Sequence, residues 1–531
     1  MTVSSIDSTR KRHRLRVVVP AFPTFNIYSR IARKTTALGP VYVASAVNEM
    51  ERWDAEVIDE NNLRRYAPRG DQTGADHAVL QRERPADVVG LYGGLTSTIP
   101  RLYQVARFYK DQGVITVAGG QHFAGENVAE ALASGIDYVV LGEGEVTIRE
   151  LLGALEGRCE IQDVKGIAYL EKGQVVYTSA REPLTEFDVL PQPDFSLVRH
   201  AKIDLYPVER IRGCCMHCEF CTVKGKPRPA PIERLLENIS QLVETHGAKE
   251  FFVVDDLFGQ DRDQTIQFCN RLSEYQERIG RRLSLTVQIR LDKARDPELL
   301  SAMRRAGIRY VAIGFESPID EELKAMKKHV SADEMMSLVR VFHRFGFIVH
   351  GMFIFGYPAR EPIAFTLPFK ERARRFKLFI RKARLDTVQV LLPVPLPGTE
   401  LRNRLEQQHR VYPIDTVGWE YYDGNFPLFE PDQPGSAQEM QEAVRGIMRG
   451  FYRFHYLFLV GASVLSFPAI AFSLHNLKPA WATWYRSWRN RLIRFGGWLT
   501  LRKWALHFQK DKFLDKLHRA HAQVIAARNR G

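Results

Sequence analysis

Three cysteines lie close together near the middle of the chain, in the run Gly213-Cys214-Cys215-Met216-His217-Cys218-Glu219-Phe220-Cys221. Cys214, Cys218 and Cys221 follow a C-x3-C-x2-C spacing. A loop this short can supply three thiolates to one cubane [4Fe-4S] cluster, which needs four ligands. One iron is then left open for a substrate or a cofactor, and this open iron predicts chemistry at the cluster.

The spacing is similar to the C-x3-C-x-aromatic-C signature of the radical S-adenosylmethionine (SAM) enzymes, and Phe220 stands at the aromatic position. The resemblance implies that the open iron chelates SAM and that one electron from the cluster cleaves the sulfonium, giving a 5'-deoxyadenosyl radical. It also implies an electron donor such as flavodoxin or ferredoxin. The alternative is a structural zinc knuckle, which needs a fourth Cys or His ligand. Cys215 and His217 are close by, but they are crowded into the same turn.

Composition limits the class of protein. With 531 residues, of which 45% are hydrophobic and 26% charged, the chain has ordinary globular composition and room for about three domains. Four of its six cysteines fall in the cysteine loop, so we expect a reducing compartment and no disulfide framework. Residues 1–16 are polar and Arg-rich and lack the apolar core of a secretory signal peptide, which favours a cytoplasmic location.

The fold class expected from the apolar pattern is α/β. Over residues 1–157 short apolar runs alternate with amphipathic stretches, which is typical of a doubly wound, Rossmann-like domain. The expected strands are 17–19, 56–58, 88–91, 114–118 and 138–141. Ligands of such sheets bind at the carboxyl ends of the strands, where this chain has the glycine-containing segments 93–98 and 119–122.

This pattern resembles the cobalamin-binding domain that precedes the radical SAM core in one large subclass. The resemblance implies that Thr96, Ser97, Gly119, Gly120 and His122 contact cobalamin, the two glycines at its tail. The Asp-x-His-x-x-Gly loop that ligates cobalt in many cobalamin proteins is missing after the first strand. A base-off cofactor, with another lower ligand or none, is therefore expected. The alternative is that the glycines only form tight turns and that the domain binds nothing.

A second α/β unit follows. Residues 158–205 are expected to form a linker with a β-hairpin that turns at residues 171–173. Over residues 206–410 strands again alternate with helices, at a spacing that suits a partial (β/α)6 barrel of the TIM type with its site at the strand carboxyl ends. The segment 393–401 contains a Pro-Gly-Thr sequence similar to that of the cobalamin-dependent radical SAM enzymes.

The resemblance also implies SAM-binding residues at the ends of successive barrel strands. Asp255 and Asp256 face the amino group, as a charge-assisted hydrogen bond would require. Arg290 pairs with the carboxylate, Glu316 lies in a Gly-x-Glu segment near the carboxylate or ribose, and Gly356 lets adenine lie against the backbone. The alternatives are a helix cap for the aspartates and an internal salt bridge for the arginine.

Residues 411–531 are expected to be helical and basic. From residue 478 to the end there are 13 Lys or Arg against two Asp, and five of the seven tryptophans lie there. Residues 457–474 carry no charge, at the lower edge of a bilayer-spanning length. Tryptophan beside arginine suits a headgroup layer, which predicts peripheral contact at the inner face of the membrane. The alternative is a basic helix packed on the core, and no nucleic-acid partner is expected.

These observations predict a cobalamin-dependent radical SAM methyltransferase that acts on an unactivated carbon of a small-molecule or lipid-like substrate. Two alternatives stay open. One is an enzyme with the same cofactors that closes a ring or rearranges a skeleton. The other is a non-catalytic cluster or zinc protein.

Overall fold

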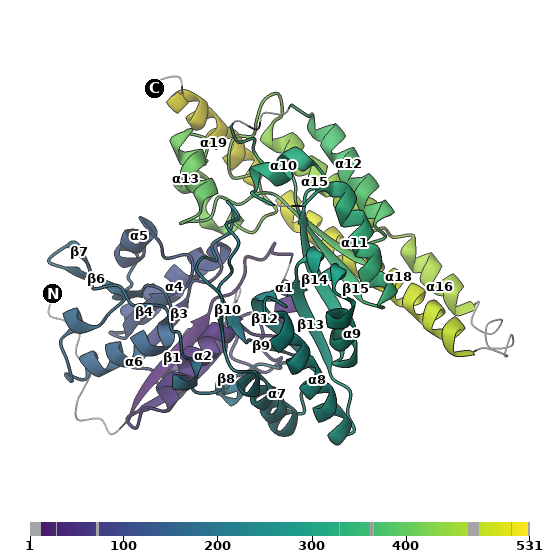
Figure 1. Cartoon of the computed structure of the whole chain (residues 1–531). Helices are drawn as coiled ribbons and strands as arrows, with labels where there is room; N and C mark the ends of the chain where they lie inside the picture. The colour runs from purple at the N-terminus through teal and green to yellow at the C-terminus, as the bar shows by residue number, and fades with distance from the viewer. Residues whose placement is uncertain are drawn as a thin grey trace.

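The computed structural model describes residues 12–27, 29–70, 74–328, 330–361, 363, 366–465, 477–510 and 512–528. It contains two large sheets, each built mainly from parallel strands. In Figure 1 the first sheet, in purple and blue, lies beside the second, in teal and green, and the long yellow helix of the C-terminal region passes along the second. The predicted α/β class is confirmed.

The first sheet has eight strands in the order β7-β6-β5-β4-β3-β1-β2-β8. The five central strands are parallel to one another. They are β1 (His13–Val19), β2 (Trp53–Asp59), β3 (Val88–Tyr92), β4 (Ile115–Gly119) and β5 (Tyr138–Val140). The outer strands come from residues 158–205, the segment that the sequence predicts as a linker. The hairpin of β6 (Ile167–Glu171) and β7 (Gln174–Tyr177) pairs with β5 through β6, and β8 (Val198–Arg199) pairs with β2.

Helices cover both faces of the first sheet, as in a doubly wound domain. On one face α2 (Leu38–Asn48) and α6 (Gly144–Leu155) pack together over the core of that side. The other face packs against α4 (Ile99–Lys110) and α5 (Asn127–Ala133). The carboxyl ends of β3, β4 and β5 therefore emerge between two helical layers, at the edge where the glycine-containing segments begin.

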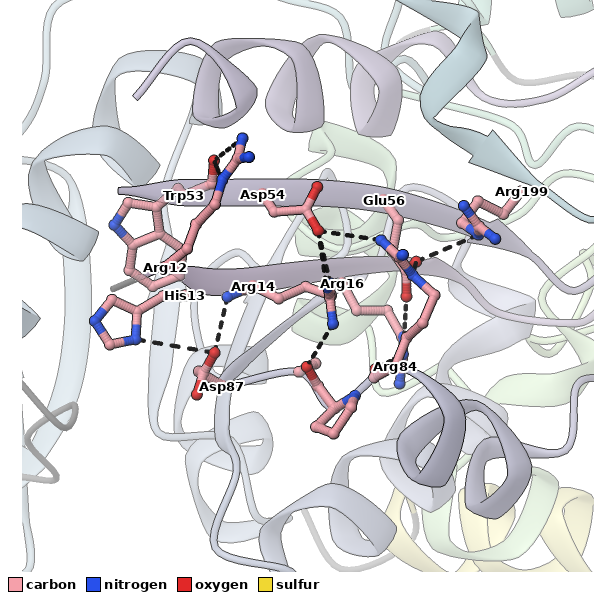
Figure 2. A network of polar contacts seen from close by, with 12 residues as sticks. Arg12, His13, Arg14, Arg16, Trp53, Asp54, Glu56, Arg84, Asp87 and Arg199 are labelled. Atoms are coloured by element: carbon pink, nitrogen blue, oxygen red, sulfur yellow. Dashed lines mark hydrogen bonds and ion pairs between the residues drawn. The ribbon is translucent and has the colours of Figure 1, made fainter. Parts of the chain in front are cut away.

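The strand β1 begins at His13, earlier than its apolar run indicates, because ion pairs compensate its buried charges. Arg16 and Glu56 are both buried, and Arg16 Nε lies 2.7 Å from Glu56 Oε1 across the β1–β2 pair. Figure 2 shows this network, in which Arg14 pairs with Asp54 and Arg84 reaches Glu56 at 2.9 Å. A buried charge is tolerated when it is paired in this way.

The second sheet has six parallel strands in the order β16-β15-β14-β13-β12-β9, and it stays open because the edge strands β9 and β16 do not pair. The strands are β9 (Leu205–Val208), β12 (Glu250–Phe258), β13 (Ser284–Ile289), β14 (Ile308–Glu316), β15 (Ile348–Ile354) and β16 (Thr387–Leu391). The connecting helices are α7 (Ile232–His246), α8 (Arg262–Arg278), α9 (Pro297–Arg305), α10 (Asp320–Ala325), α11 (Ala332–Arg344) and α12 (Phe369–Lys382). Neighbouring strands are joined in sequence order, so this is a partial (β/α)6 barrel.

The C-terminal region is helical, and part of it packs on the rest of the chain. The barrel unit ends with α13 (Glu400–Gln407), and the main helices after it are α14 (Ile414–Val417), α15 (Ala437–Phe451), α16 (Tyr456–Leu465), α18 (Leu477–Lys510) and α19 (Phe513–Arg528). Trp504 and Phe513 are buried in the same apolar cluster as Phe25 of the first domain. None of the described helices is both long and apolar enough to cross a bilayer.

Candidate functional site

One cavity of about 560 Å³ lies between the two sheets, at the carboxyl ends of β3, β4 and β5. Gly119, Gly120 and Gln121 line it from the first domain, and Thr222 and Lys224, which follow the last cysteine, line it from the second. Its inner wall is apolar and runs along the sheet under α2 and α6; it includes Val17, Val117, Val140 and Ile148. The glycine segment and the cysteine loop therefore face a shared space.

The backbone at Gly120 fits only glycine. Its φ is +125°, and an added Cβ would lie 2.6 to 2.9 Å from backbone atoms of Gly93 and Gly94. The loops that follow β3 and β4 are thus in direct backbone contact, and Gly119 and Gly120 add no side chain to the cavity. A glycine-lined strand end above an apolar wall fits the elongated tail of a cofactor such as cobalamin.

The cysteine loop is held at its first end by the two aspartates of β12. Oδ1 of Asp255 accepts hydrogen bonds from the backbone N–H groups of Arg210 at 2.6 Å and Ile211 at 3.0 Å. Oδ2 of Asp256 accepts one from the N–H of Gly213 at 2.8 Å. Asp255 is buried in this role, whereas Asp256 also lines the cavity. Of the two, Asp256 is the one placed to meet a ligand.

The three thiols of the loop suit a cluster. Cys218 is buried and Cys214 and Cys221 are half-buried, whereas Cys215 is exposed. Burial, and after it the charge of the neighbouring thiols, raises the pKa of Cys214 and of Cys221. Thiolates gathered this closely need a cation to compensate them, and iron supplies it. In the described part of the chain, no three His, Cys, Asp or Glu side chains are grouped to hold one metal ion; in a cubane cluster each cysteine binds an iron of its own.

Two further predicted SAM residues lie beside this loop. Nη1 of Arg290 is 3.2 Å from Sδ of Met216, which lies inside the loop. Glu316 pairs with Lys328 at 2.9 Å. Burial lowers the pKa of Lys328, but the charges of Glu316 and Cys218 outweigh it, and the pKa is raised. Arg290, Glu316 and Lys328 thus converge on the cysteines.

Of two further predicted residues, His122 lies in the apolar core and Gly356 lies against α15. His122 is buried, stands edge-on to Trp419 with ring centroids 4.8 Å apart, and has its pKa lowered to about 3 by burial. Its ring is neutral and packed in the core. A Cβ added at Gly356 would lie 2.5 Å from Sδ of Met440, so this side of the Gly356 backbone faces α15.

A second cavity of about 330 Å³ adjoins the first, and Gln121 and Thr222 line both. Thr96 and Ser97 line it from the first domain. On the other side it is lined by the loop after β16, through Val394, Leu396 and Pro397. Asp423 also lines it; Oδ2 of this residue is buried and has no hydrogen-bond partner among the described residues. Burial raises the pKa of Asp423 to about 7.

Sequence reasoning missed the ion pairs that join the two domains at the cavity. Arg228 donates from Nη1 and Nη2 to the carboxylate of Glu143, at 3.0 and 2.7 Å. Arg212 pairs with Glu145 at 2.8 Å and with Glu209 at 2.6 Å. All five residues line the first cavity. The Arg228–Glu143 and Arg212–Glu145 pairs join different domains, so no local spacing in the sequence indicates them, whereas Glu209 lies only three positions before Arg212.

Sequence reasoning also missed Glu219, which lies inside the cysteine loop between Cys218 and Cys221. It is fully buried, and its carboxylate accepts hydrogen bonds from Arg404 and Tyr357. These partners lie 185 and 138 positions away along the chain.

Two family matches agree with this arrangement. Residues 28–152 match the B12 binding domain, and residues 208–362 match the radical SAM superfamily. The chain is therefore a radical SAM enzyme with a B12-binding domain, a class that uses a [4Fe-4S] cluster, SAM and cobalamin. The predicted cofactors are confirmed at this level.

Relatives of the chain include methyltransferases and a cyclase. An uncharacterized methyltransferase of Pyrococcus horikoshii, PH0819, is 29% identical over 406 residues, which cover 73% of this chain and 82% of the relative. The hopanoid C-2 methylase of Rhodopseudomonas palustris is 28% identical over 245 residues, 45% of each chain. An anaerobic magnesium-protoporphyrin IX monomethyl ester cyclase of Rubrivivax gelatinosus is 25% identical over 382 residues, 68% of this chain and 65% of the relative.

Solved structures share the fold. The radical SAM methyltransferase TsrM of Kitasatospora setae, solved with cobalamin and a [4Fe-4S] cluster, has a TM-score of 0.57 at 17% identity, and the match covers 75% of this chain and 78% of TsrM. The cobalamin-dependent radical SAM enzyme OxsB, with aqua-cobalamin bound, has a TM-score of 0.61 at 14% identity, covering 97% of this chain and 84% of OxsB. At these identities the likeness concerns the fold alone.

Proposed function

We propose that the chain is a cobalamin-dependent methyltransferase that modifies an unactivated carbon of a small molecule. The observation that carries this proposal is the shared cavity, which the glycine end of β4 and the segment after Cys221 both line. Cobalamin bound on the first domain would then meet, in the same cavity, a radical formed at the cysteine loop. Cofactors carry the difficult chemistry, and the protein positions them and excludes water.

In this proposal Cys214, Cys218 and Cys221 hold the cluster, and Asp256, Arg290 and Glu316 surround SAM. When bound, SAM would supply the adenosyl radical for hydrogen removal from the substrate carbon, and methylcobalamin would supply the methyl group. The convergence of Arg290 and the Glu316–Lys328 pair on the cysteine loop supports the placement of SAM there. A one-electron donor of the flavodoxin or ferredoxin type would reduce the cluster.

The test is a comparison of metabolites and lipids from a deletion strain and its parent by mass spectrometry. The expected result is a species present only in the parent that carries one methyl group in place of one hydrogen of a species accumulated in the deletion strain. Anaerobic incubation of the purified protein with that precursor, SAM and methylcobalamin should then produce it. A precursor that differs from its product by the hydrogens lost in ring closure would refute methyl transfer.

Loss of hydrogens in ring closure, or a product that is an isomer of unchanged mass, defines the other candidate function, a cobalamin-dependent cyclase or rearrangement enzyme. It is favoured by the relation to the anaerobic cyclase of Rubrivivax gelatinosus, which extends over 68% of this chain. Both functions use the same cluster and the same cavity. Only the mass of the product separates them.

We further propose that α16 and α18 contact an anionic membrane, which would suit a lipid-like substrate. Large apolar side chains are exposed along α16: Phe458 is 67% and Leu465 82% exposed. Exposed apolar surface of this kind marks an interaction site. On α18, Arg486, Arg502 and Lys503 are exposed and supply positive charge for lipid headgroups.

Co-sedimentation with vesicles containing anionic lipid tests this contact. Phe458→Asp should reduce the bound fraction because it places a charge on the apolar face of α16. Tyr66→Asp is the matched control, since Tyr66 is 90% exposed but lies in the first domain. Equal binding of the two variants and the parent would refute the proposal.

A further inference from the structure

Glu219 is a fully buried carboxylate inside the cysteine loop, directly after Cys218. Its Oε1 accepts a hydrogen bond from Nε of Arg404 at 2.7 Å, and its Oε2 accepts one from Nη2 of Arg404 at 3.1 Å and one from the hydroxyl of Tyr357 at 2.6 Å. Nη1 of Arg360 lies 3.7 Å from Oε1. A carboxylate is buried in this way only when partners compensate the loss of water.

The same residue attaches the loop to two barrel segments. The backbone carbonyl of Glu219 accepts from the N–H of Leu401, so both its main chain and its side chain bind α13. Tyr357 belongs to the segment after β15, and its ring stands edge-on to Phe220. Asp255 and Asp256 hold the loop before its first cysteine, and Glu219 holds it between the second and the third.

The charges of this arrangement act on the cluster. Reduction adds one electron, so a fixed negative charge nearby opposes it and a fixed positive charge favours it. Because the Glu219 side chain has no exposure and that of Arg404 only 16%, water screens them poorly. Removing the negative charge of Glu219 should therefore make reduction of the cluster easier, and removing the positive charge of Arg404 should make it harder.

We propose that Glu219 is a positioning residue that fixes the cysteine loop and, through its charge, holds the reduction potential of the cluster low. A low potential is what makes the reduced cluster able to transfer an electron to a sulfonium. The inference depends on the cluster and is independent of whether the product is methylated or cyclised.

The experiment is a redox titration of the full-length chain, reconstituted anaerobically with iron and sulfide and titrated with dithionite while the reduced cluster is followed by EPR. No substrate or cobalamin is needed. Glu219→Gln should raise the midpoint potential, and Arg404→Gln, which keeps a hydrogen-bond donor, should lower it. The double variant should return toward the parent. Glu371→Gln, at a half-buried residue on α12 that pairs with Arg374, is the control and should not shift the potential.

Glu219→Asp keeps the charge and should keep the parent potential even where the shorter side chain lowers iron content. If Glu219→Gln retains no iron, Arg404→Gln and Glu219→Asp still decide the question. Shifts of the same sign in the two single variants, or an unchanged potential in Arg404→Gln at full iron content, would overturn the proposal. A loss of iron in every variant with an unchanged potential in the remaining clusters would also overturn it, because it would indicate a structural role alone.

Discussion

Oγ1 of Thr222 donates a hydrogen bond to Oε1 of Gln121 at 2.9 Å. Thr222 directly follows the last cysteine of the loop, and Gln121 directly follows the glycine pair at the end of β4. Both residues line both cavities. This bond therefore joins the cysteine loop to the glycine-containing loop after β4, at the boundary between the two cavities.

The Thr222–Gln121 bond should give a measurable coupling between the two loops. Thr222→Val and Gln121→Leu should each lower the free energy of unfolding. The double variant should lose less than the sum of the two, with a coupling of about 0.5 to 1 kcal/mol, the range of a single hydrogen bond. Chemical denaturation of the parent and the three variants measures it. Strictly additive effects would mean that the bond contributes nothing.

Gly120→Ala should impair both the first domain and its cofactor site. Its φ of +125° and the backbone of Gly93 and Gly94 leave no room for a Cβ. Strain of this kind costs about 1 to 3 kcal/mol, and the displaced loop should no longer hold cobalamin. Unfolding measurements and the corrinoid absorption of the purified protein test both effects. Gly125→Ala is the control: it shares a positive φ of +57°, but its added Cβ meets no atom within 4 Å. It should therefore lose some stability through backbone strain and yet retain the corrinoid band.

Asp423 should make the stability of the parent fall as the pH rises. Burial raises its pKa from 3.8 to about 7 in the folded chain. The folded state therefore holds a proton that the unfolded state releases, and the stability present below pH 3.8 is lost progressively up to about pH 7. Asp423→Asn, which has no proton to lose, should show a flatter dependence over this window.

Asp59, Asp255 and Glu322 also have pKa values raised by burial. The comparison therefore uses the difference in the free energy of unfolding between Asp423→Asn and the parent at each pH, measured by denaturant unfolding. Parallel curves for the two proteins would show that Asp423 titrates normally.

The sequence was sufficient for features that depend on neighbouring residues. Cys214, Cys218 and Cys221 share one loop, so their spacing alone indicates the cluster. The glycines at the ends of β3 and β4 and the alternation of strands and helices likewise indicate both domains, because periodicity is local.

Features that depend on partners far away in the chain could not be predicted from the sequence. The Glu219–Arg404 pair spans 185 positions. The early start of β1 requires Arg16 to meet Glu56 on another strand. His122 follows the glycine pair as a cobalamin contact would, but the indole of Trp419 packs against it in the core. In each case tertiary contacts decide what a side chain does.

The central claim is that the cysteine loop carries a cluster that cleaves SAM reductively. The most direct measurement is the amount of 5'-deoxyadenosine formed when the anaerobically reconstituted chain is mixed with SAM and dithionite, beside its iron content. The parent and Cys215→Ala should both bind iron and form 5'-deoxyadenosine, because Cys215 is exposed and outside the ligand spacing. Cys218→Ala should lose the cluster and form none. A parent loaded with iron that forms no 5'-deoxyadenosine, or a Cys218→Ala variant that still forms it, would contradict the account.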